Sequence, residues 1–103
     1  MTYDVFQQKI GKTTSISATS TSASVTLDSV GAAAENLRVF NAGPNTVFIT
    51  WGVGSATATT TTNLPIPAGG VENFFKGPGA DTVAAICAST QTATVYFTPG
   101  EGV

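Results

Sequence analysis

Apolar and polar residues alternate with a period of two along much of the chain. In the segment LRVF at 37–40, Leu37 and Val39 face one side while the residues between and after them face the other. Comparable runs occur at 25–27, 46–51, 71–75, 82–88 and 92–98. Successive side chains of a β-strand point to opposite faces, so these runs predict short strands.

Dense turn signals separate the predicted strands. Gly and Pro recur in NAGPNT, PIPAGG, KGPGAD and TPGEG, where Pro restricts φ and Gly adopts conformations that other residues avoid. Helical periodicity is confined to GAAAEN at 31–36, which predicts one turn at most. The pattern therefore predicts an all-β protein, an antiparallel β-sandwich or jelly roll of about seven or eight short strands.

The turn AGPN at 42–45 lies between the runs 37–40 and 46–51. It predicts that the two runs pair as an antiparallel hairpin within one sheet. Val47, Ile49 and Trp51 then share one face, which we interpret as core. An exposed Trp51 could instead stack on a sugar, although most Trp residues are well buried.

Several aromatic residues fall on faces that should be polar in a small sandwich. Phe48 opposes the core face of its strand, Phe74 and Phe75 are adjacent and must point to opposite sides, and Tyr96 opposes its two neighbours. Either a segment of the same chain covers these aromatic residues or a partner does. Residues 1–12 form a predicted N-terminal arm before a single domain at 13–103. The candidate partner interface comprises Tyr3, Phe6, Ile10, Phe48, Phe74, Phe75 and Tyr96.

Low charge restricts the partners. Charged residues make up 10% of the chain, against roughly 25% in typical globular proteins, and the net charge is −2. The four basic residues are scattered, which argues against binding nucleic acid or an anionic membrane. The abundant Thr and Ser side chains are typical of exposed strand faces.

Catalytic and metal-binding groups are scarce. The chain has no His and a single Cys, which excludes His-dependent nucleophiles and thiolate clusters. We interpret Cys87 as a small buried hydrophobe. Six isolated carboxylates leave a hydrolase with paired carboxylates as a remote alternative. We therefore expect no enzymatic activity, no cofactor and no metal. Because no signal peptide or membrane span is visible, we also expect a soluble protein made in a cytoplasm.

Three segments resemble small capsid decoration proteins of tailed bacteriophages, also called cement or head-stabilising proteins. They are NLRVFNAGPNTVFITWG, LPIPAGGVENFFKGPG and TVAAICASTQTATVYFTPGEG, which together span roughly residues 35–102. The resemblance implies a virion protein assembled in the bacterial host. It implies dimers or trimers that bind the major capsid protein on the capsid exterior and stabilise contacts between its subunits. The alternative function is a receptor- or carbohydrate-binding module of a phage tail or fibre.

Overall fold

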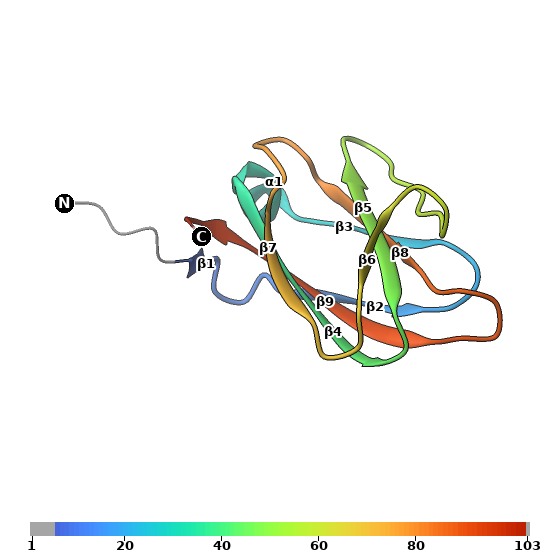
Figure 1. Cartoon of the computed structure of the whole chain (residues 1–103). Coiled ribbons are helices and arrows are strands. Elements are labelled where there is room, and N and C mark those ends of the chain that lie inside the picture. Colours follow the sequence, from blue (N-terminus) through green and yellow to red (C-terminus); the bar gives the residue numbers. More distant parts are fainter. Residues whose placement is uncertain (1–5, 103) are drawn as a thin grey trace.

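The computed structural model describes residues 6–102, which form nine strands and one short helix (Figure 1). All strand pairs are antiparallel. The elements are β1 (Gln7–Gln8), β2 (Thr14–Ala18), β3 (Ala23–Thr26), α1 (Ser29–Ala33), β4 (Asn36–Pro44), β5 (Val47–Gly52), β6 (Leu64–Ile66), β7 (Val71–Phe75), β8 (Thr82–Ile86) and β9 (Ala93–Glu101).

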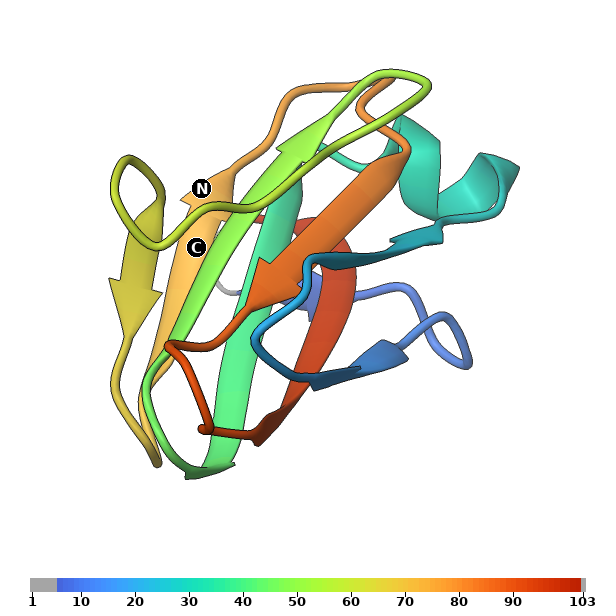
Figure 2. The ribbon, with the colours of Figure 1, turned by 90° about the vertical axis from the view of Figure 1, so that its right-hand side faces the viewer.

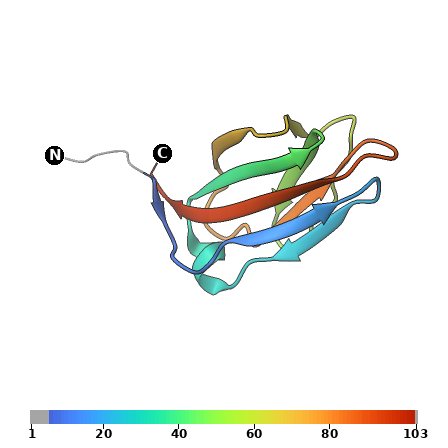
Figure 3. The same cartoon turned by 90° about the horizontal axis from the view of Figure 1, so that it is seen from below.

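The strands form two sheets that face each other, which confirms the predicted all-β sandwich. The five-stranded sheet has β4 at its centre, with β7 on one side and β9 on the other, and β1 and β2 both pair with the far edge of β9 (Figure 3). The four-stranded sheet has the order β3-β8-β5-β6. The strand count exceeds the prediction because β1 and β6 are too short to carry an alternating pattern.

The core lies between the sheets and consists of the inward residues of both. The alternation predicted this face correctly in β4, β5 and β9. Trp51 is half-buried at the edge of this core, with its ring 5.4 Å from the ring of Phe74. The largest fully buried side chains include Phe97, Leu37, Ile49, Ile66, Val39, Val47, Val83 and Val95.

The predicted hairpin between β4 and β5 is wrong. β4 pairs with β7 and β9, whereas β5 pairs with β6 and β8 in the other sheet. The chain at 44–47 therefore passes from one sheet to the other. Both strands carry one strongly apolar face, and placing the two faces opposite each other buries both.

Asn41 fixes this corner from inside the protein. Its fully buried amide nitrogen donates to the carbonyl oxygens of Asn45 and Ile66, both at 2.8 Å. Its side-chain oxygen accepts from the N–H of Gly43, also at 2.8 Å. One polar side chain thus joins β4, the corner and β6, which satisfies backbone groups that the change of sheet would otherwise leave unpaired.

The long connection at 53–63 crosses the outer face of the four-stranded sheet (Figure 2). Ala58 is buried, and its N–H donates to the Ser22 hydroxyl at 2.9 Å. Ala84 is fully buried as well, although its register places it on the outer face of β8. A segment of the same chain therefore runs over part of this sheet.

The helix α1 begins earlier than the pattern GAAAEN predicts. Asp28 caps it by accepting from the N–H of Gly31 at 2.9 Å, and the side-chain amine of Lys12 lies 2.6 Å from the same carboxylate. Beyond its end, the buried amine of Lys76 donates to the carbonyl oxygens of Ala32 and Ala80. Within residues 6–102, no helix has the length and apolar character that crossing a membrane requires.

Candidate interaction surface

The outer face of the five-stranded sheet carries an exposed apolar row. Val71, Phe40 and Tyr96 are neighbours in register on β7, β4 and β9, and they point away from the core. The rings of Phe40 and Tyr96 stack, with centroids 6.1 Å apart and planes 16° apart. Their exposed fractions are 54%, 38% and 39%, so all three remain accessible. An antiparallel sheet commonly presents polar residues on its solvent face, and this row does the opposite.

A polar row follows on the same face, one step along the strands. Asn73, Arg38 and Thr98 are register neighbours there. The Arg38 Nε donates to the Asn73 side-chain oxygen at 3.0 Å, and its guanidinium carbon lies 4.5 Å from the centre of the Phe6 ring. A hollow of about 200 Å³ opens between Phe6, Gln8, Arg38 and Thr98. No carboxylate among residues 6–102 forms an ion pair with Arg38.

The described part of the predicted arm packs on its own chain. Gln7 and Gln8 pair with Glu101 and Gly100 of β9, and the Phe6 ring covers Gly100. A Cβ at Gly100 would lie 2.6 Å from the Phe6 ring and 2.5 Å from the Gln7 carbonyl oxygen. Only a glycine therefore permits this close approach. The arm residue Tyr3 lies outside the described residues.

The structure separates the other predicted interface residues. Tyr96 belongs to the apolar row, and Phe75, which is 69% exposed, lies at the end of the same face. Ile10 is exposed in the turn between β1 and β2, away from these rows. Phe48 is half-buried on the outer face of the other sheet, and Phe74 packs against the core. Phe48 and Phe74 therefore do not belong to the surface on the outer face of the five-stranded sheet.

Sequence reasoning missed Phe40, Val71 and Arg38 as members of this surface. The signal for Phe40 was present, because alternation in LRVF places it on the face opposite Leu37 and Val39. The sequence pattern does not show that β4 pairs with both β7 and β9. That pairing brings Phe40 beside Tyr96, at a separation of 56 residues in the sequence.

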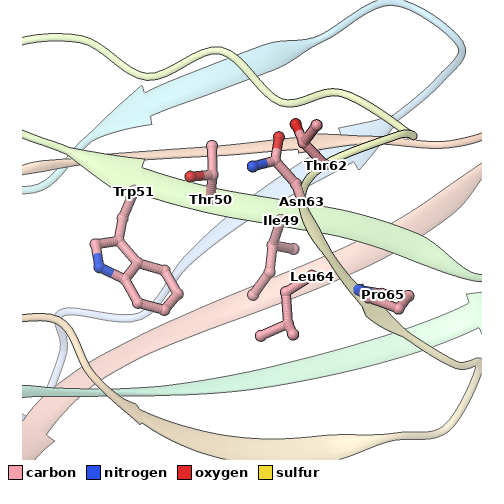
Figure 4. A pocket seen from close by; sticks show the side chains of 7 residues that line it. All are labelled: Ile49, Thr50, Trp51, Thr62, Asn63, Leu64 and Pro65. Atoms are coloured by element: carbon pink, nitrogen blue, oxygen red, sulfur yellow. The ribbon is translucent and has the colours of Figure 1, made fainter.

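A second hollow, of about 340 Å³, opens where β6 diverges from β5 (Figure 4). The half-buried Trp51 lies at one end, and Thr50, Thr62 and Asn63 contribute polar groups. The Asn63 side-chain oxygen already accepts from the N–H of Thr59 at 2.6 Å. The remaining lining residues are Ile49, Leu64 and Pro65.

Two carboxylates have pKa values lowered by structural partners. Hydrogen bonds from Lys12 and from the N–H of Gly31 lower the pKa of Asp28. Hydrogen bonds from the N–H of Gly54 and from Thr82 lower the pKa of Asp81. Among residues 6–102, no group of three or more His, Cys, Asp or Glu side chains is placed to hold a metal ion.

The sequence matches no protein-family model, and no curated protein matches it. One solved structure is similar, a chain from the work titled "Bacillus endospore appendages form a novel family of disulfide-linked pili". It has a TM-score of 0.51 and 18% sequence identity, covering 96% of this chain and 88% of that chain. At this identity the likeness establishes the shared fold alone.

Proposed function

We propose that the protein is a structural virion protein that binds the outer surface of a phage capsid and stabilises contacts between major capsid subunits. The observation that carries the proposal is the exposed row of Val71, Phe40 and Tyr96 on the outer face of the five-stranded sheet. Contiguous apolar surface of this kind marks interaction sites. The capsid as partner follows from the resemblance of residues 35–102 to decoration proteins.

The chemistry of this face defines the partner surface that fits it. Stacked Phe40 and Tyr96 offer flat apolar area, and aromatic residues and Arg are enriched among the residues that dominate binding energy. Arg38 borders the 200 Å³ hollow without a carboxylate partner among residues 6–102. A partner with an apolar patch and a nearby Asp or Glu would complement both features.

The structural neighbour is consistent with a structural role for this fold. Its title describes appendages that are disulfide-linked pili, so a chain of this fold can serve in a structural assembly. The present chain has one Cys, and Cys87 is buried in the core cluster, where desolvation raises its pKa. A buried thiol of raised pKa is unreactive, so assembly here would depend on noncovalent surfaces.

The test is co-sedimentation with expanded, undecorated phage heads from the same source, with unexpanded heads as the comparison. We expect saturable, stoichiometric binding to expanded heads only. The double variant Phe40→Ser/Tyr96→Ser should bind at least about tenfold more weakly, because it removes the central apolar contacts.

Leu64→Ser is the matched control, since Leu64 is 41% exposed but lies on the other sheet. It should bind like the wild type. Trp51 fluorescence verifies that each variant is folded. No binding to either form of head would refute the proposal, and equal losses in the two variants would refute the assignment of this face.

A second candidate function is a carbohydrate-binding module of a phage tail or fibre. The observation that favours it is the hollow beside Trp51, whose ring is half-buried and which has Thr50, Thr62 and Asn63 nearby. Titration with a glycan panel, followed by Trp51 fluorescence, tests it directly. A saturable spectral shift that Asn63→Ala weakens would support this function, and an unchanged spectrum would exclude it.

A further inference from the structure

The strand β7 is an open edge of the five-stranded sheet. On one side it pairs with β4, in the register Phe40↔Val71 to Asn36↔Phe75. On its other side it has no neighbouring strand among residues 6–102. Four of its five residues are exposed, and two of those, Val71 and Phe75, are apolar. Exposed apolar edges are templates for pairing with another strand, and proteins commonly protect them with charges or proline.

Hydrogen bonds at the ends of β7 show which of its backbone groups are free. The carbonyl oxygen of Gly70 accepts from the N–H of Asn41, and the N–H of Lys76 donates to the carbonyl oxygen of Glu35. In an antiparallel pair, alternate residues direct both backbone groups toward the partner strand. Positions 70, 72, 74 and 76 therefore point toward β4. Val71, Asn73 and Phe75 direct their N–H and C=O groups to the open edge.

We propose that two copies of this chain pair through β7 in an antiparallel arrangement, with a two-fold axis passing beside Asn73. Asn73 then pairs with Asn73 of the second copy, and Val71 pairs with Phe75 at both ends. Every backbone donor and acceptor on the open edge finds a partner in this register. The five-stranded sheets of the two copies become one continuous sheet, a recognised form of strand addition. The inference does not depend on the capsid as partner.

Side chains also match in this register. On the outer face, Val71 lies beside the exposed Phe75 of the second copy, which brings two apolar groups together on each side of the axis. The single charge on the strand, Glu72, lies opposite Phe74 of the second copy and not opposite its own equivalent. Direct like-charge pairs across the strands are thus avoided.

The other sheet edges are poorer templates. β6 has three residues, one of which is Pro65, and proline lacks the N–H that a ladder requires. β1 has two residues. The exposed residues of β2 and β3 are hydroxyl-bearing, namely Ser15, Ser17, Ser24 and Thr26, so pairing there would bury little apolar area. β7 alone combines length, open backbone groups and exposed apolar side chains within residues 6–102.

Pairing of one five-residue strand is a small interface, which places it among weak, concentration-dependent contacts. Sedimentation velocity on the wild-type protein, up to about 1 mM, is the appropriate measurement. We expect a reversible monomer–dimer equilibrium. A monomer throughout this range, or a trimer, would overturn the proposal.

Asn73→Pro and Asn73→Ala form a matched pair of variants. Both remove the hydrogen bond from Arg38 to the Asn73 side chain. Only proline removes the backbone N–H, which points away from β4, so the ladder within the subunit is retained. Asn73→Pro should weaken dimerisation at least about tenfold, because two intersubunit hydrogen bonds are lost by symmetry. Equal dimerisation of the two variants would contradict the proposed pairing.

A charge-complementation test avoids any effect of proline on folding. The variant Val71→Lys/Phe75→Lys places like charges opposite each other in the proposed register, and so does Val71→Glu/Phe75→Glu. Each variant alone should be monomeric, whereas an equimolar mixture should form heterodimers. Homodimers in either variant alone, or the absence of heterodimers in the mixture, would refute the register.

Discussion

Replacing Asn41 by Ala tests whether one buried amide holds the corner between the two sheets. Asn41 is fully buried, and its side chain makes three hydrogen bonds of 2.8 Å, to the backbone of Gly43, Asn45 and Ile66. Alanine removes all three and supplies no replacement. The N–H of Gly43 and two carbonyl oxygens then lose a partner at the point where the chain changes sheets.

The expected loss of stability follows from the number of hydrogen bonds that the Asn41 side chain makes. A typical hydrogen bond contributes about 1 kcal/mol net, and a buried group left without a partner costs about 1–3 kcal/mol. Asn41→Ala should therefore lower the free energy of unfolding by about 3 kcal/mol or more. A domain of this size has a total of about 5–15 kcal/mol, so the variant would lose a large share of its stability. The midpoint of thermal unfolding should fall by about 12 °C or more.

Urea denaturation followed by the fluorescence of Trp51 measures this loss. Asn45→Ala is the control, because the Asn45 side chain is half-buried and makes one bond, to the carbonyl oxygen of Thr92 at 3.0 Å. It should cost about 1 kcal/mol. Asn41→Asp has nearly the same shape but no donors, and at pH 7 it should destabilise at least as much as Ala. A loss below about 1 kcal/mol for Asn41→Ala would refute the assigned role.

Three further predictions concern the acid dependence of stability, the packing of Phe6 and β1 on β9, and the reactivity of the Cys87 thiol. Hydrogen bonds lower the pKa values of Asp28 and Asp81 below 3.8, so their stabilisation is present above that pH and disappears as the pH falls through the lowered values. Asp28→Asn and Asp81→Asn should flatten the acid limb of a stability–pH curve, and an unchanged limb would contradict this. Gly100→Ala should displace Phe6 and β1 from β9, detected as faster amide exchange at 7–9; unchanged exchange would refute the close packing. Cys87 should react with iodoacetamide far more slowly in the native protein than in urea, and equal rates would show that it is accessible.

Period-two alternation was sufficient to predict the sandwich and much of its core. Val39, Ile49 and Phe97 are fully or almost fully buried, as their positions within their runs predict. The burial of Cys87 was predicted from its apolar run in the same way. These inferences succeed because alternation is a local property, and one residue of slippage would expose every apolar group of the strand.

Nonlocal pairing was beyond the sequence pattern. The turn at 42–45 suggested a local hairpin, but the buried bonds of Asn41 to Asn45 and Ile66 belong to a corner between sheets. The path of the connection at 53–63, which the bond from the Ala58 N–H to the Ser22 hydroxyl holds in place, was equally invisible. Adjacent Phe74 and Phe75 were expected on opposite faces, yet the pattern does not show which of them faces the core: Phe74 packs against it, whereas Phe75 is exposed.

The proposed capsid contact and the proposed β7 pairing can be separated because they use different atoms of the same sheet. The aromatic row uses the side chains of Phe40 and Tyr96 on the outer face, whereas pairing uses backbone groups on the edge beside Asn73. In the proposed dimer both aromatic rows lie on the same side of one continuous sheet, so a dimer would bind a shell at two points. Avidity then predicts that Asn73→Pro weakens binding to expanded heads but retains the intrinsic contact of each copy. Phe40→Ser/Tyr96→Ser should weaken head binding at least about tenfold while the dimer persists in solution. If Asn73→Pro loses dimerisation but binds heads as tightly as the wild type, pairing does not contribute to binding on the shell.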